Sequence, residues 1–239
     1  MKKLSIVVAM SALFSGATLA SEWSYQGESG PEHWGKVSQT CQTGKNQSPI
    51  NIDQTTAAKL KGIDVRYQGS VTSLVNNGHT LQAGVSGDNT VRIDGKVFTL
   101  KQFHFHTPSE NLIKSRQYPL EAHFVNADEQ GNLAVIAVMY EVGEVNPQLT
   151  ALGETLPTKG NSVSITTPLP VASLLPSTDN YYRFNGSLTT PPCSEGVRWI
   201  VLKESKMISS EQKDEWNKMM GNNNRPIQAY NARMVLDKE

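Results

Sequence analysis

The chain has 239 residues, of which 38% are hydrophobic and 18% are charged, as in an ordinary soluble globular protein. This length is enough for one good-sized core, although length alone would also allow two small domains. Basic and acidic residues balance at 22 each and form no charge run, so the composition gives no indication of a nucleic-acid or membrane-surface partner.

The first twenty residues differ from the rest of the chain. Two lysines precede a mostly apolar stretch, Leu4 to Phe14, which is too short to span a bilayer, and small residues follow it. This pattern predicts a secretory signal peptide over residues 1–20, whose short length favours export to a bacterial periplasm. The remaining residues, 21–239, are predicted to form a single mature domain without a transmembrane stretch. Because the signal peptide contains two of the 22 basic residues, this domain has 20 basic and 22 acidic residues.

From Ser21 to about Asn51 the chain is rich in Gly, Pro, Gln and aromatic residues, as is typical of loops that cover a core. Strand patterns dominate after this segment. Val91–Ile93 and Lys96–Leu100 flank Asp94-Gly95, a pair typical of a two-residue hairpin turn.

Further strands are predicted by two kinds of pattern. Gln102–His106 and Leu120–Val125 alternate between two faces, as half-buried strands do. Leu133–Tyr140 is a continuous apolar run and predicts a central strand buried on both faces. Val197–Leu202 is a similar run, interrupted only by Arg198.

One helix is predicted, over about Ser210–Met220. Ser209 and Gln212 can form a capping box at its start, and Gly221 stands where a C-terminal cap belongs. Many short strands with one late helix predict a mainly β architecture.

The chain contains two cysteines, Cys41 and Cys193. In an oxidising compartment an even pair usually forms a disulfide. In the chain-entropy model, closing so long a loop stabilises a protein by several kcal/mol. Two buried free thiols are the alternative.

Three of the five histidines lie in the two alternating strands. His104 and His106 are two residues apart and therefore point to the same face, with Phe103 and Phe105 on the other. If the strand around His123 is an antiparallel neighbour, its imidazole completes a triangle. Three neutral imidazoles with an open fourth position are typical of a catalytic zinc site. An HxH pair alone is also compatible with histidines hydrogen-bonded within a sheet, or with a cupin-type metal site.

Two polar residues support the metal site. Histidines that bind a metal usually donate their second N–H to an oriented acceptor. Gln102 stands two residues before His104 on the same face, and Glu121 stands in the same relation to His123. We therefore expect Gln102 and Glu121 to accept hydrogen bonds from the ligands, and a buried Glu121 to have a partner.

At these residues the chain resembles the α-class carbonic anhydrases. The resemblance runs from about Trp23 to Pro226, essentially the whole mature chain. The motifs that carry it are Pro31-Glu32-His33-Trp34, Gln47-Ser48-Pro49-Ile50, Asn76-Asn77-Gly78-His79, Gln102-Phe103-His104-Phe105-His106, Ser109-Glu110, Glu121-Ala122-His123, Ser187-Leu188-Thr189-Thr190-Pro191-Pro192, Trp199 and Arg225-Pro226.

The resemblance implies one mainly β domain on a large, twisted, mostly antiparallel sheet of about ten strands, with short peripheral helices and Zn²⁺ at the base of a conical cleft. It also implies reversible hydration of carbon dioxide to bicarbonate and a proton, by attack of zinc-bound hydroxide on CO2. The substrate is then a small molecule, and a homodimer remains compatible with the sequence.

The resemblance also implies a role for each matching residue. Thr189 would orient the hydroxide and donate a hydrogen bond to Glu110, while His79 would carry the proton to buffer because histidine titrates near neutral pH. His33 matches a structural position and is left out of the site. The zinc ligands would be His104, His106 and His123; the CO2 pocket Val125, Val135, Leu188 and Trp199, with Thr190 beside bicarbonate; and the proton path Tyr25, Asn77 and Gln82.

Asn111 departs from the family pattern, because many members carry a histidine there, and the change could alter hydrogen bonding near Glu110. Thr107-Pro108 replaces a tryptophan-containing stretch typical of animal members. The rival function is a catalytically silent binding protein of the same fold. Such relatives typically lack a zinc histidine, whereas this chain has all three.

Overall fold

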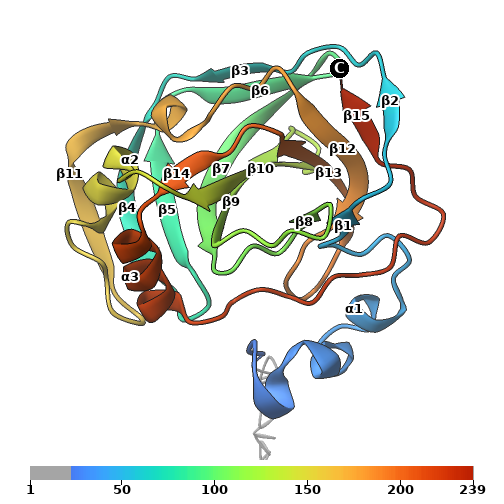
Figure 1. The fold of residues 1–239 in the computed structure, drawn as a ribbon, viewed down its shortest axis with the longest axis horizontal. Helices are drawn as coiled ribbons and strands as arrows, with labels where there is room; N and C mark the ends of the chain where they lie inside the picture. Colours follow the sequence, from blue (N-terminus) through green and yellow to red (C-terminus); the bar gives the residue numbers. More distant parts are fainter. Residues whose placement is uncertain (1–22, 239) are drawn as a thin grey trace, which may run out of the picture.

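A computed structural model describes residues 23–238 of the chain. The predicted signal peptide, residues 1–20, lies outside this described part. Within it, a 13-stranded sheet dominates the molecule, and short helices lie at its margins (Figure 1). The prediction of a mainly β fold is therefore confirmed.

The large sheet has a continuous path of ten strands, and three further strands pair beside it. The path runs β11 (Ser162–Pro170), β4 (Ser70–Asn76), β5 (Leu81–Ser86), β7 (Lys96–His106), β9 (Leu120–Ala127), β10 (Leu133–Val142), β13 (Glu195–Leu202), β12 (Tyr181–Ser187), β15 (Leu236–Lys238) and β2 (Thr56–Ala58). The strands off this path are β3 (Asp64–Tyr67), β6 (Asn89–Ile93) and β14 (Lys206–Ile208), and a separate small sheet pairs β1 (Asn51–Ile52) with β8 (Leu112–Ile113).

One detail of the predicted sheet needs correction. It has thirteen strands in the described residues rather than about ten, because β2, β14 and β15 have only three residues each and are too short to show a period in the sequence. The sheet is mostly antiparallel, as predicted; the parallel pairs are those of β10 with β13 and with β14, and that of β15 with β2.

The predicted hairpin is confirmed as the β6–β7 turn. Ile93 pairs with Lys96, so Asp94 and Gly95 form a two-residue loop. Both have positive φ, 51° and 81°, as the tight turn between antiparallel strands requires. This turn starts the long strand β7, whose far end carries His104 and His106.

The central strands separate two apolar cores. Phe103, Phe105 and Phe124 belong to the larger core on one face of the sheet, together with the inward residues of β4, β5 and β6. Val135 and Trp199 belong to the second core, on the other face. Since neighbouring residues of a strand alternate between faces, His104, His106 and His123 point away from the larger core.

The predicted helix is α3 (Ser210–Met220). The Ser209 hydroxyl accepts from the Gln212 N–H, the Gln212 side chain accepts from the Ser209 N–H, and Gly221 follows with φ of 65°. Helix α2 (Pro147–Gly153) was not predicted, and Asn146 caps it by accepting two backbone N–H groups. The pair Asn146-Pro147 is a helix-start pattern in the sequence, but the helix is too short to show a period.

The N-terminal segment, predicted as loops, contains short helical turns. These are η1 (Gly27–Ser29), η2 (Pro31–Lys36) and α1 (Thr40–Thr43), with another turn, η3 (Val171–Leu174), later in the chain. Figure 1 shows the N-terminal turns gathered at one margin of the molecule. None of the helices among residues 23–238 is long and apolar enough to cross a membrane.

Candidate metal centre

Strand pairing brings three histidines together on one face of the sheet. His104 on β7 lies directly opposite His123 on the antiparallel neighbour β9, and His106 follows His104 by two residues. The ring centroids of the three imidazoles lie 4.5 to 5.4 Å apart. One potential ligand atom from each ring lies within 4.8 Å of the others. This separation is suited to a single metal ion between them.

Each imidazole also has a polar neighbour on one of its nitrogens. His104 Nδ1 lies 2.8 Å from Gln102 Oε1, and His106 Nδ1 lies 2.8 Å from the backbone carbonyl oxygen of Asn223. His123 Nε2 lies 3.0 Å from Glu121 Oε1, although the angle is not that of a hydrogen bond. The nitrogens left to face the centre are therefore Nε2 of His104, Nε2 of His106 and Nδ1 of His123.

The electrostatics favour neutral imidazoles. Burial lowers the pKa of His104 and of His123 well below the usual value, and the neighbouring His106 lowers both further. Burial also lowers the pKa of His106, against the effect of its hydrogen bond to Asn223. Neutral imidazole is the form that binds a metal. His106 Nε2 is buried without a hydrogen-bond partner among the described residues, an arrangement that a metal ion would complete.

Glu121 is held by three N–H groups. Its Oε2 accepts from the backbone of Glu110 at 2.7 Å and of Asn111 at 2.9 Å, and its Oε1 accepts from Asn111 Nδ2 at 2.8 Å. Burial raises the pKa of Glu121, and the hydrogen bonds from Asn111 oppose that shift. The residue that departs from the family pattern therefore fixes the carboxylate beside His123. Asn111 Oδ1 also accepts the Ile50 N–H.

These contacts predict that Asn111→Ala weakens metal binding. The variant leaves Glu121 with fewer donors, and loss of such outer partners typically lowers metal affinity by about 10- to 100-fold. Chelator competition with the purified protein measures the change. Asn111→His should lose less, because an imidazole can also donate to Glu121, and Asn132→Ala, on the exposed turn after β9, should change nothing. Equal affinities in Asn111→Ala and the native protein would contradict this account.

Glu110 is a buried carboxylate beside the histidines. Its Oε1 accepts the backbone N–H of Arg225 at 2.8 Å, and its Oε2 lies 3.5 Å from His106 Nε2. Burial raises the pKa of Glu110 well above its usual value, and the Arg225 N–H and the Thr189 side chain oppose that shift. Thr189 is buried as well. Its effect on the pKa of Glu110 puts its side chain beside that carboxyl group.

An apolar row continues from the histidines across three strands. Val125 on β9 pairs with Val135 on β10, which in turn pairs with Trp199 on β13. The Trp199 ring packs edge-on against His123, with centroids 4.8 Å apart. Leu188 packs against the same core. The predicted pocket residues are therefore contiguous with the metal centre.

The predicted proton-path residues lie in the N-terminal segment and around the turn between β4 and β5. Gln82 pairs with His104 across β5 and β7, so the two side chains share a face. Burial, and to a lesser extent the charge of Glu110, raises the pKa of Tyr25 well above its usual value. Asn77 is exposed, and its Oδ1 accepts the N–H groups of His79 and Thr80. Asn77 thus shapes the turn that carries His79.

Three contributors were not found from the sequence. Asn223 and Arg225 act through backbone groups that no residue pattern reveals, within a run of asparagines that is typical of a loop. Trp23 stacks on the His79 ring, with centroids 3.9 Å apart and planes inclined by 14°. The aromatic richness of this segment is visible in the sequence, but the partner of each ring is not.

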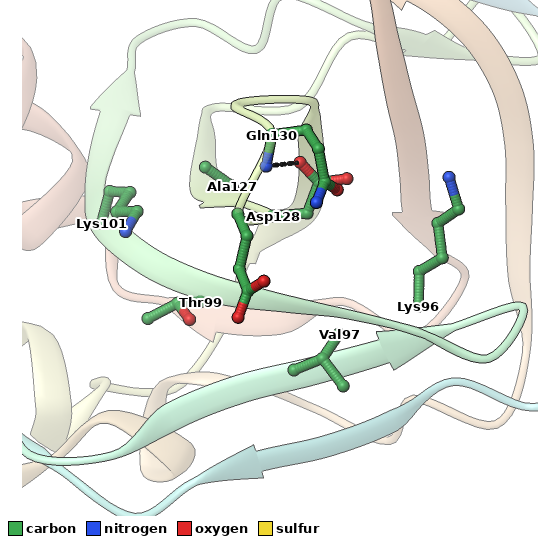
Figure 2. A pocket seen from close by; sticks show the side chains of 8 residues that line it. Lys96, Val97, Thr99, Lys101, Ala127, Asp128 and Gln130 are labelled. Carbon is green, nitrogen blue, oxygen red and sulfur yellow. Dashed lines mark hydrogen bonds between the residues drawn. The ribbon is translucent and has the colours of Figure 1, made fainter.

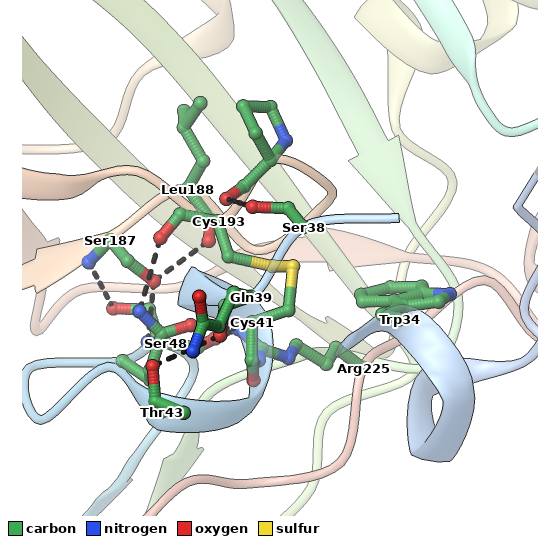
Figure 3. Close-up of a disulfide and its surroundings, with 12 residues drawn as sticks. Trp34, Ser38, Gln39, Cys41, Thr43, Ser48, Ser187, Leu188, Cys193 and Arg225 are labelled. Carbon is green, nitrogen blue, oxygen red and sulfur yellow. Dashed lines mark hydrogen bonds between the residues drawn. A yellow bond between two sulfur atoms is a disulfide. The ribbon is translucent and has the colours of Figure 1, made fainter. Parts of the chain in front are cut away.

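The predicted disulfide between Cys41 and Cys193 is present. It joins the N-terminal segment to the loop 188–194, which contains Thr189 and Thr190. Figure 3 shows the bond with Leu188 of this loop nearby. The bond is consistent with a secreted protein.

A separate hollow of about 400 Å³ lies toward the other end of β7 (Figure 2). Lys96, Lys101 and Asp128 are among its lining residues, and none of the predicted site residues is. The side chains around it are mostly exposed and of both charges. It shares no residue with the metal centre.

The fold and the histidines together define a mainly β protein with a candidate catalytic metal centre. A family model for eukaryotic-type carbonic anhydrase matches residues 29–239. The carbonic anhydrase of Pectobacterium carotovorum is 47% identical over 240 residues, covering 98% of each chain. The solved α-carbonic anhydrase of Photobacterium profundum is 56% identical with a TM-score of 0.88, covering 90% of this chain and 100% of that one.

A second solved relative comes from Thermovibrio ammonificans, an α-carbonic anhydrase in complex with the inhibitor sulfanilamide. It is 47% identical with a TM-score of 0.87, covering 90% of this chain and 98% of that one. This chain belongs to the eukaryotic-type, or α-class, carbonic anhydrase family.

Proposed function

We propose that this chain catalyses the zinc-dependent, reversible hydration of carbon dioxide to bicarbonate and a proton. The observation that carries the proposal is the triangle of imidazoles from the half-buried His104 and the buried His106 and His123, whose outer nitrogens already face fixed polar groups. Three neutral nitrogen ligands with room for a fourth fit a catalytic zinc ion. Bound there, zinc supplies hydroxide near neutral pH by lowering the pKa of water to about 7, the value known for carbonic anhydrase itself.

Thr189 and Glu110 would orient the nucleophile. Glu110 Oε2 is buried and has no hydrogen-bond partner in the described part of the chain, so it is suited to accept from the Thr189 hydroxyl. With its hydrogen donated to Glu110, the Thr189 oxygen would be left as an acceptor and would orient the O–H group of the nucleophile held at the centre. Such an orienting contact is made before reaction and favours attack along one direction.

The apolar row would hold carbon dioxide beside the nucleophile. Val125, Val135 and Trp199 lie on one face of neighbouring strands, next to His123, and offer surface without charge. A neutral linear molecule binds such a surface without losing hydrogen bonds. Thr190, next to Thr189 in the same loop, would lie beside the product bicarbonate, which a polar hydroxyl suits better.

His79 would carry the released proton to buffer. It is half-buried at the turn between β4 and β5, beside the predicted water path of Tyr25, Asn77 and Gln82. Its ring stacks on Trp23, which places it near the N-terminal margin of the molecule. An imidazole that reaches both the site and solvent can accept and release protons near neutral pH.

The decisive experiment uses purified mature protein. We expect one zinc per chain and fast hydration of CO2, measured by pH-indicator stopped flow with metal analysis on the same sample. A zinc-loaded protein with hydration no faster than buffer would disprove the proposal and favour the silent binding protein.

We also propose that residues 1–20 direct the chain to the periplasm. Sequencing the N-terminus of the exported protein tests this proposal, because removal of the signal peptide would leave Ser21 as the first residue.

The shuttle role predicts a buffer-dependent defect in His79→Ala. In weak buffer kcat should fall by about 10- to 100-fold. A positioned proton-transfer group contributes about 100-fold or more to a rate, so the upper value corresponds to the smallest such contribution. High concentrations of imidazole should restore kcat, while kcat/KM stays near the native value because CO2 attack is untouched. His33→Ala serves as the matched control. Slowing that is the same in weak buffer and in high imidazole would remove His79 from this role.

A further inference from the structure

Asn223 is a buried residue that contacts both the metal centre and the turn of His79. Its side chain is 1% exposed, and it lies in the segment between α3 and the C-terminal strand. Its backbone oxygen accepts from His106 Nδ1 at 2.8 Å. Its side-chain amide donates to the carbonyl oxygen of His79 at 3.0 Å. One residue therefore bonds a candidate zinc ligand and the candidate shuttle.

The same amide group also bonds β7 between the two histidine ligands. Asn223 Nδ2 donates to the Phe105 carbonyl at 2.9 Å, and Asn223 Oδ1 accepts the Thr107 N–H at 2.7 Å. The side chain thus uses both amide hydrogens and its oxygen in a site closed to water. A buried amide with this many partners has one orientation, because rotating it would leave groups unpaired.

Thr80 adds a second connection between the turn and the strand. Its hydroxyl donates to the Phe105 carbonyl at 2.6 Å and accepts the Phe105 N–H at 3.2 Å. The turn that carries His79 is therefore hydrogen-bonded to both backbone groups of Phe105, its N–H and its carbonyl oxygen. Without the Asn223 side chain, the His79 carbonyl loses the hydrogen bond that connects it, through Asn223, to β7. Thr80 retains its two hydrogen bonds to Phe105.

We propose that Asn223 is a positioning residue that fixes the His79 turn at a set distance from the metal centre, so that water can connect the two. The proposal rests on the shuttle role of His79 proposed above. Proton transfer through water depends steeply on geometry, and a displacement of about 1 Å can cost 10²-fold in rate. Asn223 touches neither substrate nor metal, and its effect passes through His79 and His106.

The variants Asn223→Ala and Asn223→Asp test the proposal. Both keep the backbone carbonyl that accepts from His106, so zinc content and kcat/KM should stay near native. Asn223→Ala removes all side-chain bonds, whereas Asn223→Asp keeps an acceptor for the Thr107 N–H and cannot donate to both carbonyls. In weak buffer kcat should fall about tenfold, and high imidazole should restore it. Asn222→Ala, whose side chain is exposed, is the matched control.

A second readout does not depend on activity. Amide hydrogen exchange of residues 77–81, measured on the metal-free protein, should quicken in both variants and stay native in Asn222→Ala. A double variant, His79→Ala with Asn223→Asp, should be no slower than His79→Ala alone, because both changes act on one step. Additive losses in the double variant would overturn the proposal.

The outcomes separate this proposal from the proposed function. If His79→Ala slows turnover only in weak buffer but both Asn223 variants keep native kcat and native exchange, Asn223 has no positioning role. Equal losses of zinc and kcat/KM in both variants would also overturn it, by showing a role in the metal centre alone. If His79→Ala shows no buffer-dependent slowing, the shuttle fails and this proposal fails with it.

Discussion

His123→Ala is expected to lose zinc and, with it, CO2 hydration. His123 is buried on β9, and its partner across the strand pair is His104, so its removal leaves two ligands and an open space. Even the loss of an outer partner lowers metal affinity by about 10- to 100-fold, and the loss of a direct ligand should exceed 10²-fold. Chelator competition gives the affinity, and stopped-flow hydration at fixed, buffered zinc gives the activity.

The fold should survive this change. The two apolar cores lie on either side of the sheet and do not depend on the metal, so the far-UV circular dichroism of the variant should match that of the native protein. His33→Ala removes a half-buried histidine on η2 outside the metal centre and should bind zinc normally. Native zinc affinity and native hydration in His123→Ala would show that the three-histidine centre is not the catalytic site.

The position of these ligands could be predicted because strand phase is a local property. A period of two places His104 and His106 on one face whatever the rest of the sheet does. The pairing of His104 with His123 was an assumption, since strand register depends on residues far apart in sequence; the observed β7–β9 register fulfils it. The same register brings Gln102 opposite Val125, which joins the candidate metal centre to the apolar row.

Backbone partners could not be predicted in this way. The acceptor for His106 is a carbonyl oxygen of Asn223, and every residue has such a carbonyl. Likewise the donor that fixes Glu110 is the backbone N–H of Arg225. The Arg225 side chain instead donates to the carbonyl oxygen of Cys41. Residue type carries no information about such contacts, so only the three-dimensional path of residues 223–225 reveals them.

The fold itself was predictable where elements are long or marked by caps. The hairpin turn at Asp94-Gly95 and the capping box of α3 depend on a few neighbouring residues, and both are confirmed. The parallel pairing of β10 with β13 was not predicted, because a doubly buried strand shows the same apolar run with either kind of neighbour.

The disulfide connects the N-terminal segment to the loop of Thr189. Cys193 bonds back to this loop through its N–H, which donates to the Thr190 carbonyl at 2.8 Å. On the other side, Arg225 Nη2 donates to the Cys41 carbonyl at 2.9 Å, and the two cysteines pack with Trp34 in a small core (Figure 3). The bond therefore fastens residues 152 positions apart in sequence beside the candidate active site.

Removing the disulfide should cause a large loss of stability. The double variant Cys41→Ser with Cys193→Ser frees a loop between residues 152 positions apart in the unfolded state, and the chain-entropy model gives a loss of about 5 kcal/mol in the free energy of unfolding. Urea unfolding followed by tryptophan fluorescence measures the change as a lower midpoint.

A reductant supplies the matched comparison. Dithiothreitol should lower the midpoint of the native protein toward that of the double variant and leave the variant itself unchanged, because the variant has no bond to reduce. An equal midpoint for the oxidised native protein and the variant would show that the small core around Trp34 and the hydrogen bonds of Arg225 hold this segment without the disulfide. The expected loss would instead mean that the stability of the protein depends on an oxidising compartment, which agrees with the export proposed above.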